Sequence, residues 1–145
     1  MTRTLPNSAT ILVVEDERTL NEAYQIILER AGYAVYSAFD GQQALAVAAE
    51  HEPDLILLDL RMPHMDGLQF LREYDLKHHH PKVKVVLFSN YDMQAEIDEA
   101  YRQGADRYIL KAWASPKELL RLVQSTLGAP KTETKTTRKA TAKGR

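Results

Sequence analysis

The sequence predicts an α/β fold in which five parallel strands alternate with five helical segments. Five short apolar runs recur along the 145 residues, and a segment with helical spacing of apolar residues follows each one. Runs of β-branched residues and leucine are typical of strands buried on both faces. Strands joined through helices pair in parallel with right-handed crossovers, so a doubly wound (βα)5 sheet with helices on both faces is expected. The runs occupy residues 11–14, 33–38, 55–58, 85–88 and 108–110.

The helical segments show both an apolar stripe and signals for their ends. The first has one apolar face, and Gly32 stands where a C-terminal cap belongs. Gly104 and Gly128 are expected to end the fourth and fifth helical segments. The stripe of the first segment consists of Leu20, Tyr24, Ile27, Leu28 and Ala31. The predicted N-terminal caps are Asp40 with Gln43, Asp66 with Gln69, and Ser115 followed by Pro116 and Glu118.

Composition limits the class of protein. The chain has no cysteine, which excludes disulfides and thiolate metal sites. No apolar run approaches the roughly 20 residues needed to cross a membrane, and residues 1–7 contain no apolar signal core. A single domain in the cytoplasm is therefore expected, without a membrane partner.

Charge is divided unevenly between the body and the C-terminal end. Residues 128–145 contain six basic residues and one acid, while residues 1–127 carry a net charge of −6. The end contains no large apolar residue, so we predict a folded domain over 10–128 and a disordered basic tail over 129–145. The tail has no aromatic residue for base stacking. We therefore expect a solvated tail that binds nucleic acid weakly, if at all.

Polar side chains follow four of the predicted strands at the point where each strand ends. Glu15 and Asp16 follow the first, Asp59 the third, Ser89 the fourth and Lys111 the fifth. The carboxyl ends of parallel strands meet at one edge of an open sheet, which is where ligands bind. One such residue alone is usually a turn residue, but the coincidence of four predicts a site.

This set of residues indicates phosphoryl chemistry with a hard divalent cation. Clustered carboxylates resist ionising together, and an all-oxygen site suits Mg²⁺. Asp59 beside such a cation is a usable nucleophile toward phosphorus, and Lys111 can pair with it. The alternatives are that Glu15 and Asp16 serve the start of the first helix and that Lys111 is solvated.

The chain resembles the receiver domains of bacterial response regulators over residues 10–127. The stretch 11–17, Ile-Leu-Val-Val-Glu-Asp-Glu, resembles their opening, and 59–67 resembles their phosphorylation loop. Ser89 and Lys111 match two further family positions. The resemblance implies a flavodoxin-like strand order of 2-1-3-4-5 and a phosphorylatable signalling switch of a two-component or phosphorelay system, which is not an enzyme.

The resemblance also implies roles for single residues. Asp59 is the phosphoacceptor and contributes to an Mg²⁺ site. Asp16 is a direct metal ligand, Glu15 acts through water, and the Arg61 backbone carbonyl is a further ligand.

The remaining implied roles concern switching and partners. Ser89 and Lys111 bind the phosphoryl group, and Tyr108 is the aromatic that turns inward. The change is read out around the fourth helical segment, fifth strand and fifth helical segment, on a face carrying Ile97, Tyr101 and Leu119. The implied partners are a sensor histidine kinase or phosphotransfer protein, an unidentified downstream protein, and a second copy bound through that face.

Two departures from the family pattern keep an alternative open. Ala112 follows Lys111 where the family usually has proline after a cis peptide, and cis before a non-proline costs about 2.5–4 kcal/mol. Asn90 stands where the family usually has a small residue. A pseudo-receiver that binds proteins without taking phosphate is the alternative.

Two other interpretations are disfavoured. A phosphatase of the haloacid dehalogenase type needs an acid where Arg61 stands. The histidines at 78–80 lack convergent partners in sequence for a metal site.

Overall fold

The five strands form one parallel sheet with the order β2-β1-β3-β4-β5. The computed structural model describes residues 9–89 and 93–130, except for the side chain of Trp113. Neighbouring strands pair in register, for example Val14 with both Ala38 and Leu58. The predicted fold class and strand order are therefore confirmed. The strands are β1 (Thr10–Val14), β2 (Ala34–Ala38), β3 (Leu55–Asp59), β4 (Lys84–Ser89) and β5 (Arg107–Leu110).

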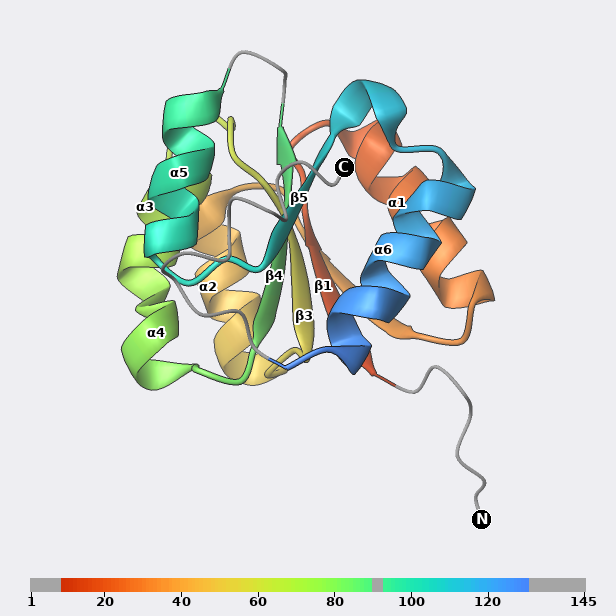
Figure 1. Ribbon diagram of the computed structural model, residues 1–145, viewed down its shortest axis with the longest axis horizontal. Helices are drawn as coiled ribbons and strands as arrows, with labels where there is room; N and C mark the ends of the chain where they lie inside the picture. Colours follow the sequence, from red (N-terminus) through yellow and green to blue (C-terminus); the bar gives the residue numbers. More distant parts are fainter. Residues whose placement is uncertain (1–8, 90–92, 131–145) are drawn as a thin grey trace.

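Helices cover both faces of the sheet (Figure 1). On one face lie α1 (Arg18–Arg30) and α6 (Pro116–Gly128), packed on a core cluster that includes Ile11, Val13, Leu57 and Phe88. The other face packs on a second cluster through α2 (Gly41–Glu50), α3 (Gly67–Tyr74), α4 (Leu76–His79) and α5 (Gln94–Arg102). A short 3-10 turn (Lys111–Trp113) follows β5.

Burial along the strands follows their place in the sheet. Every residue of β3 and β4 is buried, whereas the edge strand β2 exposes alternate residues and the four residues of β5 are half-buried. The near-continuous apolar runs thus belong to the strands flanked on both sides. None of the helices in residues 9–89 and 93–130 is long and apolar enough to cross a membrane.

Most of the predicted helix ends are present. The Asp40 carboxylate accepts a hydrogen bond from Gln43 N at 2.8 Å, and Asp66 forms a capping box with Gln69. Ser115 Oγ accepts from Glu118 N at 3.2 Å. Gly32 and Gly104, with φ of 103° and 110°, follow the C-caps of α1 and α5 in the left-handed region.

The connection between β3 and β4 differs from the prediction of a single helical segment. Asp75 has a left-handed backbone, with φ of 56°, and it separates α3 from the short α4. A left-handed residue breaks the helical hydrogen-bond ladder, so the chain changes direction there.

Two expectations concern the loop after β5 and the C-terminal end. No peptide bond in the described ranges is cis, so Lys111–Ala112 is trans. The last helix ends at Gly128, while residues 131–145 of the predicted basic tail lie outside the described residues. Asn90 also lies outside them.

Candidate functional site

The carboxyl ends of the strands bring the predicted polar residues to one edge of the sheet. Glu15 follows β1, Asp59 and Ser89 are the last residues of β3 and β4, and Lys111 follows β5. Asp59 pairs in register with Phe88, so the ends of β3 and β4 are nearly level. Parallel pairing of the central strands is therefore what gathers these residues from positions almost 100 residues apart along the chain.

Lys111 is the centre of the site because it contacts two buried carboxylates. Its Nζ donates a hydrogen bond to Asp59 Oδ2 at 3.0 Å and lies 3.1 Å from Glu15 Oε1. Backbone amides hold the other carboxylate oxygens: Arg61 N donates to Asp59 Oδ1 at 3.2 Å, and Glu17 N donates to Glu15 Oε2 at 3.0 Å. Lys111 therefore reaches Asp59 although the Lys111–Ala112 peptide is trans.

The electrostatics of the site show an excess of negative charge. Glu15 is 1% exposed and Asp59 is 2% exposed. Burial raises the pKa of Glu15 to about 7, against the hydrogen bond from Glu17 N, and the Asp59 charge adds to the rise. Burial also raises the pKa of Asp59, although Lys111 opposes it. Burial alone lowers the pKa of Lys111, but contacts with Asp59 and Glu15 outweigh it and raise the pKa.

Three carboxylates lie close enough together to hold one metal ion. One oxygen each from Glu15, Asp16 and Asp59 lies within 4.8 Å of the others, and among the described residues no second group of this kind occurs. Asp16 is exposed, so the cluster opens to solvent. A donor set made only of oxygen, with more negative charge than Lys111 can balance, fits a hard cation such as Mg²⁺.

Ser89 ends β4, which pairs with β3, and adds an unsatisfied donor at the same edge of the sheet. The side chain is 1% exposed, and its Oγ has no hydrogen-bond partner in the part of the chain that the structure describes. Leaving a buried hydroxyl without a partner costs free energy. A hydroxyl in this state at the end of β4 fits an incoming group with acceptor oxygens.

Tyr108 lies on β5 in the layer between the sheet and α5. It is half-buried and meets the Tyr101 ring edge-on, with ring centroids 6.4 Å apart. The contact face around the fourth helical segment, fifth strand and fifth helical segment stays a prediction. It does not carry Ile97, Tyr101 and Leu119 on its surface, because these side chains are only 3%, 3% and 0% exposed. Each points inward from its helix into a core cluster.

The three histidines at 78–80 do not gather around one point. His78 and His79 each place Nδ1 within 2.9 Å of an oxygen of Asp75, while His80 lies 3.3 Å from Glu52.

One residue of the site was missed in the sequence. Asn21 is 0% exposed and donates through Nδ2 to the backbone carbonyls of Glu15 and Ala38. Its spacing from Tyr24 and Leu28 places it on the buried face of α1. A polar residue at such a position is the signal that was available.

The chain belongs to the response regulator receiver domain family, whose family model matches residues 11–124. Receiver domains are signalling switches of two-component systems and interact with histidine kinases or phosphotransfer proteins.

Solved structures of receiver proteins are similar to the chain over most of its length. The receiver domain of NtrX from Brucella abortus is 31% identical, with a TM-score of 0.74, over 83% of this chain and 99% of that chain. The chemotaxis protein CheY4 of Vibrio cholerae is 27% identical, with a TM-score of 0.75, over 82% and 98%. The receiver domain of sensor histidine kinase PA1611 from Pseudomonas aeruginosa is 28% identical, with a TM-score of 0.74, over 84% and 99%. That domain has a magnesium ion coordinated in its active-site cleft.

Proposed function

We propose that this receiver domain is a phosphorylatable switch in which Asp59 accepts the phosphoryl group in the presence of Mg²⁺. The observation that carries the proposal is the contact of Lys111 with two buried carboxylates, those of Asp59 and Glu15. A cation placed this way neutralises the resting nucleophile and is already beside any phosphoryl oxygen that forms on it.

The transfer itself requires little from the protein beyond position and charge. A carboxylate oxygen of Asp59 forms a bond to phosphorus while the bond from phosphorus to the donor breaks and the donor leaves. Lys111 then pairs with a phosphoryl oxygen, and the Ser89 hydroxyl, which lacks a partner among the described residues, donates to another.

Residues of this chain would hold the metal ion. Glu15, Asp16 and Asp59 bring carboxylate oxygens together. Asp16 would be a direct ligand, Glu15 would act through water, and the Arg61 backbone carbonyl would be a further ligand. A bound Mg²⁺ supplies positive charge that offsets the charge gathered on the phosphoryl oxygens.

We propose that the signal leaves the site through Ser89 and Tyr108. When Ser89 turns toward the phosphoryl group, Tyr108 turns inward toward the space beside it, and the surface of α5, β5 and α6 changes. The Tyr101 ring already contacts Tyr108 on this side. Backbone NMR shifts with beryllofluoride, a phosphoryl mimic, should therefore change in residues 93–108, and changes confined to the loops at Asp59 and Lys111 would contradict this route.

The partners in this proposal follow from family membership. This chain acts in the cytoplasm, and its phosphodonor is a sensor histidine kinase or phosphotransfer protein. The output partner is a downstream protein or a second copy of the chain, which binds to the surface of α5, β5 and α6.

Intact mass after incubation with acetyl phosphate and Mg²⁺ tests the proposal. The wild type should gain one phosphoryl group and Asp59→Asn none. Asp98→Asn is the matched control, because this exposed carboxylate on α5 contacts only Gln94 in the hydrogen bonds described. It should label like the wild type. A wild type that stays unmodified would favour the pseudo-receiver, and labelling of Asp59→Asn would overturn the assignment.

A further inference from the structure

Asn21 joins α1 to the ends of two strands. Its Nδ2 donates to the Glu15 carbonyl at 2.9 Å and to the Ala38 carbonyl at 3.0 Å, while its Oδ1 accepts from Gln25 Nε2 at 2.8 Å. The side chain is completely buried. Both protons of the amide are therefore used, on carbonyls at the ends of β1 and β2.

The same residue also holds the turn after β1 through its backbone. Asn21 N donates to the Glu17 carbonyl at 2.9 Å, and Glu15 N donates to the Ala38 carbonyl at 3.2 Å. Residues 15–17 are thus fixed at both ends, once by the Asn21 side chain and once by its backbone. This three-residue turn carries two of the three carboxylates that converge on one point.

The direction of the Glu15 side chain depends on that turn. Its Oε2 accepts from Glu17 N within the turn, and its Oε1 reaches Lys111. A shift of the Glu15 carbonyl would rotate the peptide that sets both the Glu15 and the Asp16 side chains. An amide fits the position because it offers two donors to two neutral carbonyls without adding a charge, whereas leucine offers none and aspartate would repel them.

We propose that Asn21 is a positioning residue for the acidic pair, which sets the 15–17 turn so that Glu15 and Asp16 face Asp59 and bind a divalent cation. The cation part of this inference rests on the proposed function. The positioning part concerns the metal-free protein and is measured separately.

The first measurement is made without metal. The Glu17 amide reports the Glu15 carboxylate directly because the two are hydrogen-bonded. In Asn21→Leu and Asn21→Asp, the Glu17 amide proton should shift upfield and exchange faster with solvent, because that bond is lost. Asn21→Ser keeps one donor, so its Glu17 amide shift and exchange rate should lie between those of these variants and the wild type. This variant supplies the result if Asn21→Leu and Asn21→Asp do not fold.

The second measurement is the affinity for Mg²⁺ alone by calorimetry. Removing a group that orients a metal ligand weakens metal binding by about 10–100-fold, and we expect a loss in this range for Asn21→Leu. Gln25→Ala removes only the bond to Asn21 Oδ1 and should stay near the wild type. Lys84→Met is the control for lost stability, because it removes two hydrogen bonds, one of them buried, at the opposite end of the sheet.

Two results would overturn the proposal. One is a Glu17 amide in Asn21→Leu, or in Asn21→Ser if the leucine variant does not fold, that keeps its wild-type shift and exchange rate. The other is a loss of Mg²⁺ affinity in Lys84→Met as large as that in Asn21→Leu at equal loss of stability. If the wild type itself does not bind Mg²⁺, the proposed function fails, whereas the Glu17 amide still decides the role of Asn21.

Discussion

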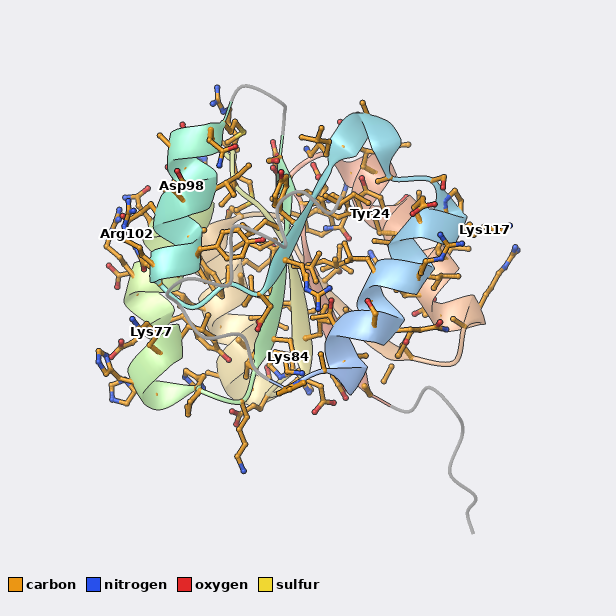
Figure 2. All side chains as sticks on the ribbon, viewed as in Figure 1. Tyr24, Lys77, Lys84, Asp98, Arg102 and Lys117 are labelled. Atoms are coloured by element: carbon orange, nitrogen blue, oxygen red, sulfur yellow. The ribbon has the colours of Figure 1, made fainter. Side chains whose placement is uncertain are left out.

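Two lysines, one buried and one half-buried, lie at opposite ends of the sheet and contact different partners. Lys84, at the start of β4, is 9% exposed and donates to the carbonyls of Thr126 and Ala129 at the end of α6. Figure 2 shows it beside the last turn of that helix. Lys111, beyond the end of β5, contacts the carboxylates of Asp59 and Glu15 instead.

The difference shows how the type of acceptor separates a structural lysine from a functional one. Lys84 donates to neutral carbonyls at the negative end of a helix dipole. Its ammonium group is hydrogen-bonded there, and no excess of negative charge surrounds it. Lys111 meets more negative charge than it can balance, in a place where burial raises the pKa of both carboxyl groups. A lysine of the second kind is free to exchange a carboxylate oxygen for a phosphoryl oxygen.

Replacing each lysine by methionine should separate the two roles most strongly in phosphorylation. Lys111→Met should slow labelling by acetyl phosphate by roughly 100-fold, because a preorganised cation on the phosphoryl oxygens is lost. Lys84→Met should label at the wild-type rate per folded molecule. Equal rates for the two variants, followed by intact mass over time, would remove the distinction.

The stability of the two variants should show the reverse order. Lys84→Met leaves the buried carbonyl of Thr126 and the part-buried carbonyl of Ala129 without this donor. It should lower the free energy of unfolding by about 2 kcal/mol. In Lys111→Met, Asp59 and Glu15 can take up protons in place of the lost cation. The decrease in the free energy of unfolding at pH 5 should therefore be smaller than in Lys84→Met. Urea denaturation with chelator present measures both, and a stable Lys84→Met protein would contradict the role assigned to Lys84.

The pH dependence of stability should come from the carboxyl end of the sheet. Glu15 has a folded pKa of about 7 and an ordinary value of 4.5, so the folded state holds the proton more tightly. Its contribution to stability is full below pH 4.5 and is lost as pH rises through 7.

Glu15→Gln removes this titration and should exceed the wild type in stability on the order of 1 kcal/mol at pH 8. The gain should disappear at pH 5, where Glu15 is protonated in the folded wild type. Thermal unfolding in chelator gives both values. A gain that is equal at pH 5 and pH 8 would show that charge at Glu15 is not its cause.

The smallest effect is expected for the ion pair between the loop after β3 and α5. Arg61 Nη2 lies 3.6 Å from Glu96 Oε2, and the two side chains are 59% and 39% exposed. Solvent screens such a pair, so a double-mutant cycle of Arg61→Ala and Glu96→Ala should give a coupling below about 0.5 kcal/mol. A larger coupling would mean that this surface contact stabilises the loop beside Asp59.

The features that depend on neighbouring residues were readable in the sequence. The caps at Asp40, Asp66 and Ser115 occur where their spacing predicts them, because each acts over three residues. The site residues were readable for a second reason: parallel strands bring their carboxyl ends to one edge, so four polar residues after four apolar runs had to be neighbours. The helix break at Asp75 could not be predicted, because no residue pattern around Asp75 signals its left-handed backbone.

What the sequence determined by itself is thus the order of strands and helices along the chain and the set of residues gathered at the carboxyl edge. Only the tertiary structure decided which polar side chains are buried. Asn21 and Lys84 would be solvated in an isolated helix or strand. They are buried because carbonyls 17 and 42 residues away along the chain come within hydrogen-bond distance. Local spacing contains no information about such partners, since they exist only when separate elements pack together.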